Sequence, residues 1–317
     1  MTNGSGRLVF VAANPSIDRL HEVDAIEAGA IHRPDRVVAV PGGKGLNAAR
    51  AAAALGGSVV AIALLGGHAG AWIEDRLAEL GVATRAIRGD GETRTCISVL
   101  DRSNGRLTEF YEPGPPISPS AFADLEAAVE EELRTGSIAV LAMSGSLPSG
   151  APRDGYGRLV AMARDRGITT IVDSHGEALT AALDARPTVV KVNAGEAAEV
   201  TRMEVGDRSS AIDAAEGLRR AGAAGVVVTL GRDGAVVCDD GGRWGLAAAS
   251  ASGRYPVGSG DAFLGGLTVA LAGGDELVAA ATLGMAAGVA NADLPGAGIL
   301  DAASVDRVRP TIDVQRL

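Results

Sequence analysis

The chain is poor in the residues that build metal centres and crosslinks. It holds two cysteines and four histidines among 317 residues, and aromatic side chains make up only 3% of it. Cys96 and Cys238 lie too far apart to suggest a disulfide framework or a zinc motif, so we expect a reducing, cytoplasmic setting. The histidines form no HxxxH pair, and we interpret each as a surface or core residue.

Positive charge is also scarce. The 29 Lys and Arg residues are outnumbered by 39 Asp and Glu residues, which leaves a net charge of −10. Nucleic acids and acidic membranes require a basic face, so we expect neither as a partner. An anionic substrate would need a local cluster of Lys, Arg and backbone N–H groups.

Long apolar runs are missing as well. Residues 1–7 lack a basic region followed by an apolar stretch, so we expect no signal peptide. No uninterrupted run is long enough to cross a bilayer, and residues 279–287 are predicted to form a buried helix.

What the chain has is a foldable, small-residue composition: 47% hydrophobic residues and 44 glycines. Short apolar runs are typical of strands that are covered on both faces. They occur at 8–11, 59–63, 138–141, 170–172, 189–192 and 226–229. Helical patterns lie between them at about 44–55, 69–80, 119–134, 153–166, 176–184, 195–202 and 209–221. This alternation predicts an α/β fold with a doubly wound, mainly parallel sheet, and two further helices after Asp261.

Two segments interrupt the alternation. Residues 16–40 carry many charges and little helical signal. Residues 92–112 alternate polar and apolar side chains around a polar turn at 101–105, which predicts a hairpin with one exposed face. Extended segments inserted into a doubly wound domain could form a small sheet that covers a site.

The most informative motif is VGSGDAF at 257–263. A turn of small residues that leads directly into a helix leaves backbone N–H groups unpaired, and the helix dipole adds positive charge there. Asp261 beside such an anion site suits a general base that deprotonates a hydroxyl as it attacks a phosphoryl group. The other interpretation is an ordinary Asp at a helix start.

A second Gly-rich motif, PGGKGLN at 41–47, leads into the first helical pattern. Gly42 and Gly43 let backbone approach a ligand closely. Lys44 and Asn47 are three residues apart, so both can project from one face of the first turn. No Ser or Thr follows the lysine, which argues against a P-loop. The alternative is a tight strand-to-helix turn.

Polar residues also follow predicted strands, where ligands bind open α/β sheets. NPSID at 14–18 ends the first strand, and Asp18 there could accept hydrogen bonds from sugar hydroxyls or simply sit in a turn. Asn193 and Glu196 share a helix face, and Glu196 could hold hydrated magnesium. Alternatively they form a capping box, which the local pattern favours. TLGRDG at 229–234 is a third strand-end turn, or a plain β-turn.

Seven motifs in one order resemble the PfkB (ribokinase-like) carbohydrate kinases, and most of all their hexose-phosphate branch, the 1-phosphofructokinases and tagatose-6-phosphate kinases. The motifs are NPSID at 14–18, GGKGLN at 42–47, GETR at 91–94, SGSLPSG at 144–150, KVNAGE at 191–196, TLGRDG at 229–234 and VGSGD at 257–261. The resemblance implies one ribokinase-like kinase domain over residues 1–317. It also implies a small β-sheet lid formed by about 16–40 and 92–112, which often serves as a dimer interface in relatives.

The resemblance also implies roles for individual residues. Asp261 would be the catalytic base, and the N–H groups of Gly258, Ser259 and Gly260 would form the anion hole. The sugar phosphate would be bound by Asp18, Gly42, Gly43, Lys44 and Asn47, with Arg94 and Ser144 on its phosphate. ATP and Mg²⁺ would be served by Lys191, Asn193 and Glu196, with Glu196 holding the metal through water, and the nucleotide side would be lined by Thr229, Gly231 and Gly234.

The chain departs from the family pattern at two places: Val192 replaces the proline of a KPN motif, and Ser259 replaces the alanine of GAGD. Thr95-Cys96-Ile97 after Arg94 is similar to tagatose-6-phosphate kinases. The implied reaction is ATP-dependent phosphorylation of a ketohexose phosphate, with fructose 1-phosphate as the first candidate. Tagatose 6-phosphate and fructose 6-phosphate are alternatives, as are an uncharged acceptor and a non-catalytic sensor. Lys44 and Arg94 argue against the uncharged acceptor, and the intact Asp261 and Glu196 against the sensor.

Overall fold

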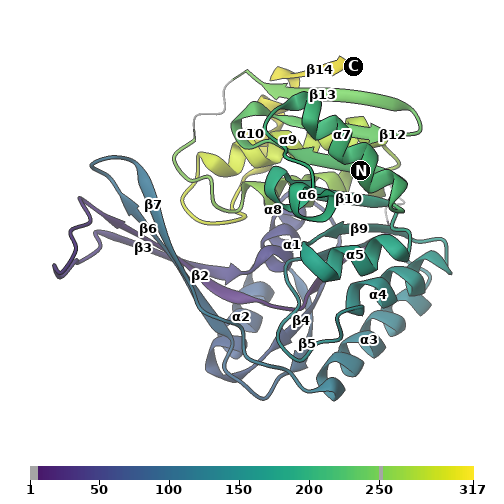
Figure 1. The fold of residues 1–317 in the computed structure, drawn as a ribbon. Helices are drawn as coiled ribbons and strands as arrows, with labels where there is room; N and C mark the ends of the chain where they lie inside the picture. The colour runs from purple at the N-terminus through teal and green to yellow at the C-terminus, as the bar shows by residue number, and fades with distance from the viewer. Residues whose placement is uncertain (1–5, 250–252) are drawn as a thin grey trace.

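A ten-stranded sheet runs through the computed structural model, which describes residues 6–249 and 253–317 (Figure 1). From edge to edge its strands are β14 (Ile312–Arg316), β13 (Gly242–Ala248), β12 (Ala235–Asp239), β11 (Gly225–Thr229), β10 (Val189–Asn193), β9 (Thr169–Asp173), β8 (Ile138–Ser144), β1 (Arg7–Ala12), β4 (Val59–Leu65) and β5 (Ala83–Arg88). All neighbours from β11 to β5 are parallel, and β12, β13 and β14 add an antiparallel edge. The predicted doubly wound, mainly parallel sheet is therefore confirmed.

In this sheet the six predicted strands are all present, and its other four strands were not predicted. β5 lies at one edge of the sheet, and its half-exposed pattern includes Arg85 and Arg88, so it lacks the continuous apolar run of a central strand. β12, β13 and β14 form the opposite antiparallel edge, where one covered face suffices.

Helices cover both faces of this sheet because alternate strand residues bury into two separate cores. On one face lie α1 (Lys44–Ala54), α2 (Gly67–Glu79), α8 (Ser259–Ala272), α9 (Leu277–Ala292) and α10 (Ala302–Val308). On the other lie α3 (Pro119–Arg134), α4 (Gly155–Arg164), α5 (Gly176–Asp184), α6 (Ala194–Thr201) and α7 (Arg208–Arg220). Two short 3₁₀ turns complete the elements, η1 (Gly231–Asp233) and η2 (Arg309–Thr311).

The seven predicted helical patterns all form helices, and the run at 279–287 lies in α9. α8 and α9 are the two helices expected around and after Asp261, and α10 was not expected. Within the described residues, no helix has both the length and the apolar character needed to cross a membrane. Residues 1–5, which carry most of the argument against a signal peptide, lie outside the described residues.

A second, four-stranded sheet projects from the large one and is called the lid sheet here (Figure 1). Its order is β3 (Arg36–Gly42), β2 (Ser16–Val23), β6 (Arg94–Asp101) and β7 (Arg106–Tyr111). The two predicted segments therefore do form a small sheet, and β6 and β7 are the predicted hairpin. One detail was wrong: Asp18 does not end the first strand of the large sheet. The chain crosses after Ala12, and Asp18 lies on β2 of the lid.

Candidate active site

A cleft of about 690 Å³ lies where the lid sheet meets the carboxyl ends of β8, β9 and β10 and the first turns of α1 and α8. A smaller pocket of about 430 Å³ adjoins it and shares Asn193, Thr229, Pro256 and Gly260 with it. The cleft brings together most of the predicted site residues: Asp18, Gly43, Lys44, Asn47, Arg94, Lys191, Asn193, Glu196, Thr229, Gly258, Gly260 and Asp261. Three others line the smaller pocket: Ser259, Gly231 and Gly234. Gly42 and Ser144 line neither.

The first turn of α8 is held open toward the cleft by the conformation of Gly258. This residue has a φ of 82°, and a Cβ on it would lie 2.4 Å from the amide nitrogen of Gly298. The amides of Gly258 and Gly260 have no hydrogen-bond partner among the described residues. One predicted donor is different. The Ser259 N–H donates to the Pro256 carbonyl at 3.1 Å, so it closes the turn and is not free for an anion.

Asp261 lies within the first turn of this helix, and only 8% of it is exposed. Burial raises the pKa of its carboxyl to about 7, and nearby Asp173 acts in the same direction, whereas the charge of Lys44 and the hydrogen bond from Asn47 oppose the rise. A carboxyl with a pKa near neutrality, close to unpaired amides, has the protonation behaviour of a general base.

The side-chain amide of Asn47 joins Asp261 to Asp18. Its Nδ2 donates to Asp261 Oδ2 at 2.9 Å and to Asp18 Oδ2 at 3.0 Å. Ser16 Oγ holds the other oxygen of Asp18 at 2.6 Å. The Asp18 carboxylate fills the space where a Cβ on Gly42 would lie, with its carbon only 2.1 Å from that position, so any side chain at residue 42 would displace it. Gly42 thus shapes the site through Asp18 without lining the cleft.

Two lysines surround a carboxylate that was not predicted, Asp173 at the end of β9. Lys44 Nζ lies 3.1 Å from Asp173 Oδ1, and Lys191 Nζ lies 2.6 Å from Asp173 Oδ2. Burial opposes ionisation of Asp173, but Lys191 and Lys44 hold its pKa below its usual range. Burial would also lower the pKa of Lys44, yet Asp173, Glu196 and Asp261 together raise it above its usual value. Both groups of this ion pair are therefore charged at neutral pH.

Glu196 forms the capping box that was one of its two roles considered from sequence. Its Oε2 accepts the Asn193 backbone N–H at 2.9 Å, while Asn193 Oδ1 accepts the Glu196 N–H at 2.9 Å, which is the capping box of α6. Its other oxygen, Oε1, faces the cleft and lies 2.6 Å from Lys44 Nζ. The capping interpretation is thus confirmed, and the second carboxylate oxygen is paired with Lys44 at the edge of the cleft.

Arg94 and Ser144 differ in how they meet the cleft. The Arg94 guanidinium donates to the backbone carbonyls of Asn14 at 3.0 Å, Glu112 at 3.2 Å and Pro15 at 3.4 Å, so it also fastens β6 to the crossing between β1 and β2. Ser144 is buried, and its hydroxyl has no partner among the described residues. Its neighbours in the chain, Gly145 and Ser146, line the cleft in its place.

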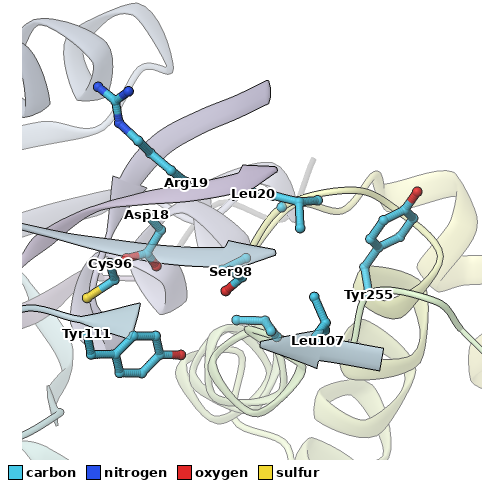
Figure 2. Close-up of a pocket in the computed structure, with 11 residues that line it drawn as sticks. Asp18, Arg19, Leu20, Cys96, Ser98, Leu107, Tyr111 and Tyr255 are labelled. Carbon is cyan, nitrogen blue, oxygen red and sulfur yellow. The ribbon is translucent and has the colours of Figure 1, made fainter. Parts of the chain in front are cut away.

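The inner face of the lid adds residues that sequence reasoning missed. Figure 2 shows Asp18 and Cys96, which are paired across β2 and β6, beside Tyr111 and opposite Tyr255. The Tyr255 hydroxyl, from the loop before α8, donates to Glu22 on β2 at 3.1 Å and so ties this loop to the lid. The alternation of polar and apolar residues along the hairpin predicts which residues share a face with Cys96. It does not predict whether that face points toward the cleft. Asp173 could have been found, since it follows a predicted strand directly.

The comparisons with known proteins show the family and the fold of the chain. The model of the pfkB family carbohydrate kinases matches residues 8–302. Phosphofructokinase-2 from Escherichia coli, solved in complex with fructose-6-phosphate, is 30% identical and superposes with a TM-score of 0.86 over 96% of this chain and 98% of that one. A possible 1-phosphofructokinase from Thermotoga maritima is 23% identical, with a TM-score of 0.90 over 98% of this chain and 99% of that one.

Ribokinase from Arabidopsis thaliana, complexed with ribose and ATP, is 20% identical and superposes with a TM-score of 0.74 over 96% of this chain and 99% of that one. At these identities the Thermotoga and Arabidopsis proteins show the fold alone, which is the ribokinase-like fold with its four-stranded lid. The family model spans nearly the whole chain, and the Escherichia coli relative is similar in sequence as well as in fold. The chain therefore belongs to the PfkB family of carbohydrate kinases and is an ATP-dependent phosphotransferase that acts on a sugar or sugar phosphate.

Proposed function

We propose that this enzyme transfers the γ-phosphoryl group of ATP to a hydroxyl of a ketohexose phosphate, and that residues 1–317 act as one kinase domain. The observation that carries the proposal is the position of Asp261. It is a buried carboxyl with a pKa raised to about 7, it lies in the first turn of α8 directly after Gly260, and Asn47 links it to Asp18 on the lid.

In the proposed reaction the acceptor hydroxyl binds between Asp18 and Asp261. Its oxygen attacks the γ-phosphorus as its proton passes to Asp261, the bond to the bridging oxygen of ATP breaks, and ADP leaves. The amides of Gly258 and Gly260 stabilise the charge on the transferring group. The smaller pocket would hold the nucleoside, since apolar Phe263, Met285 and Val289 line it together with the turn at Gly231 and Gly234.

The acceptor's own phosphate is assigned to Arg94, assisted by Lys44. Lys44 and Lys191 are already paired with carboxylates, whereas no carboxylate of the described residues lies within salt-bridge distance of Arg94. Its charge is therefore available for an anion, even though its N–H groups also hold backbone carbonyls.

Magnesium fits the donor set on the nucleotide side of the cleft. Mg²⁺ binds oxygen ligands and in kinases is held by one or two carboxylates together with water and phosphate oxygens. Glu196 presents one carboxylate oxygen to the cleft, and Asp173 lies on the far side of the same lysine. Among the described residues no group of three or more His, Cys, Asp and Glu could hold a metal ion alone. Glu196 would thus hold magnesium jointly with ATP, where the ion neutralises phosphate charge.

The choice of acceptor is tested by measuring ADP release with fructose 1-phosphate, tagatose 6-phosphate and fructose 6-phosphate side by side, with fructose and ribose as uncharged controls. The sequence motifs favour fructose 1-phosphate. Fructose 6-phosphate gains support from the 30% identical Escherichia coli phosphofructokinase-2, whose structure was solved with that sugar. A preference for the uncharged sugars would refute the role of Arg94 and the sugar-phosphate assignment.

We also propose a homodimer formed through the lid sheet. Val37 on β3 and Phe110 on β7 expose 52% and 61% of their surface on this sheet, and a partner that covers the sheet would bury this apolar area. The Escherichia coli phosphofructokinase-2 has been solved in a tetrameric inhibited form, so that relative assembles. Light scattering on the wild type and on Phe110→Asp tests the proposal, and a wild type that is monomeric at micromolar concentration refutes it.

A further inference from the structure

Arg50, in the second turn of α1, is a buried cation without an acidic partner within salt-bridge distance among the described residues. Only 6% of it is exposed, and no carboxylate of the described residues lies within salt-bridge distance of its guanidinium. Burial lowers the pKa of Arg50 to about 10, and the charges of Asp18 and Asp261 oppose the fall. A buried charge is costly unless hydrogen bonds compensate it, so the partners of this guanidinium indicate what it does.

Those partners are three oxygens. Arg50 Nε donates to the Pro41 carbonyl at 2.8 Å, and Nη2 donates to the Ala297 carbonyl at 2.5 Å and to Asn47 Oδ1 at 2.7 Å. Pro41 lies on β3 of the lid, directly before Gly42 and Gly43. Arg50 therefore joins the base of the lid, the first turn of α1 and the loop that contains Ala297.

The Ala297 loop supports the start of α8. A Cβ on Gly258 would lie 2.6 Å from Ala297 Cα and 2.4 Å from the Gly298 nitrogen, so this loop packs directly against the turn that presents the unpaired amides. A Cβ on Gly298 would in turn lie within 3.0 Å of three atoms of Asn47. A guanidinium bonded to both Ala297 and Asn47 thus fixes the anion turn and the Asn47 amide relative to each other.

The bond to Asn47 also determines which way its amide faces. An amide group has an acceptor oxygen at one end and donor hydrogens at the other. Because Arg50 can only donate, Asn47 Oδ1 must face Arg50, and Nδ2 must face the carboxylates of Asp18 and Asp261. The reverse orientation would place an oxygen against two carboxylates and an N–H group against a cation.

We propose that Arg50 is a positioning residue for the phosphoryl-transfer centre: it holds the Asn47 amide so that the sugar-binding carboxylate Asp18 and the base Asp261 stay in register, and it anchors the Gly258 turn beside them. The inference rests on the proposed function, in which Asp261 is the base. Arg50 itself lines neither pocket, so it contacts neither substrate.

The test compares Arg50→Met and Arg50→Lys with Arg219→Met. Arg219 is the control, since its guanidinium also donates to two backbone carbonyls, those of Ala224 and Asp239, but on α7 and outside both pockets. It is more exposed than Arg50 and also pairs with Asp240. For Arg50→Met we expect kcat to fall by about 10- to 100-fold, because small displacements of reacting groups are costly. The KM for the sugar phosphate should rise, and the KM for ATP should change less than twofold.

The pH dependence supplies a readout that a purely structural role would not move. Loss of the Arg50 charge and of the fixed Asn47 donor should raise the pKa of Asp261. The fall of kcat/KM on the acidic side of its pH profile, called the acidic limb here, should therefore move to higher pH. Arg50→Lys keeps a cation, so its kcat and the pH position of its acidic limb should lie between those of the wild type and Arg50→Met. This variant provides the measurement if Arg50→Met does not fold. Arg219→Met should keep the wild-type kcat and pH profile.

The outcomes separate the two proposals. If the wild type phosphorylates a ketohexose phosphate but its acidic limb is unchanged in both Arg50 variants, the positioning role is refuted and the proposed function stands. Equal losses in the Arg50 and Arg219 variants would likewise refute it, since they would reflect stability alone. A wild type without ketohexose-phosphate kinase activity overturns both proposals.

Discussion

Lys44 and Glu196 form an ion pair across the cleft, with 2.6 Å between Nζ and Oε1. Lys44 is the first residue of α1, beside the candidate sugar site. Glu196 lies in the first turn of α6, on the candidate nucleotide side of the cleft. A metal that engages Glu196 must therefore compete with Lys44, and a lysine released by Glu196 still keeps Asp173 at 3.1 Å. This pair therefore connects the first turn of α1 to the first turn of α6.

Replacing Glu196 by glutamine should separate its metal role from its capping role. Gln at this position can still accept the Asn193 N–H, so the capping box survives and stability should change by less than about 1 kcal/mol. Loss of the carboxylate charge should raise the magnesium concentration for half-maximal activity by about 10-fold or more. A magnesium titration of the initial rate, with a thermal melt of the same sample, measures both.

The matched variant is Glu196→Ala, which removes the cap as well. It should show the same magnesium defect and an additional loss of about 1 kcal/mol in stability. An unaltered magnesium dependence in both variants would contradict a metal role for Glu196 and leave it only the cap.

The pKa of Asp261 predicts how activity depends on pH. A base must be unprotonated to accept the hydroxyl proton, so kcat/KM should fall about tenfold per pH unit below a pKa of about 7. Asp261→Asn should lower kcat by about 10²- to 10⁴-fold with a small change in sugar-phosphate KM, and its residual activity should lack this limb. Rate profiles from pH 5.5 to 9 test it, and a variant that retains wild-type kcat removes Asp261 from the mechanism.

Much of this architecture could be predicted from sequence because its signals are local. The pattern at 119–134 matches α3, which runs from Pro119 to Arg134, and the small-residue turn at 257–261 begins α8. The lid segments were visible as breaks in the alternation. These features depend on residues that are near each other in the chain.

What could not be predicted depends on contacts between distant segments. Asp173 follows a predicted strand, yet its role as the shared partner of Lys44 and Lys191 requires strands and helices that are far apart in sequence. The link from Arg50 to Ala297 spans 247 residues. The closure of the Ser259 N–H on Pro256 depends on how the turn folds, because the motif alone leaves that amide available.

Asp173→Asn should destabilise the fold strongly. Lys191 is 3% exposed and lies 2.6 Å from Asp173, so the substitution leaves a buried ammonium without its anion. Removing one member of such a pair costs about 3–5 kcal/mol. Urea denaturation measures the loss, and the double variant Asp173→Asn with Lys191→Met should be more stable than Asp173→Asn alone. Additive losses in the two single variants would show that the pair is not coupled.

Asp261→Asn should instead stabilise the protein, and increasingly so as pH rises. The folded-state pKa of about 7 lies above the ordinary value of 3.8, so the fold retains a proton that the unfolded chain releases, and wild-type stability falls as pH rises between these values. Asparagine does not titrate, so its advantage over the wild type should grow by about 2–3 kcal/mol from pH 5 to pH 8. Urea midpoints at the two pH values provide the comparison, with pH 5 as the internal control. An advantage that is the same at both pH values would mean that burial does not hold this carboxyl near neutrality, and the proposed base would lose its physical basis.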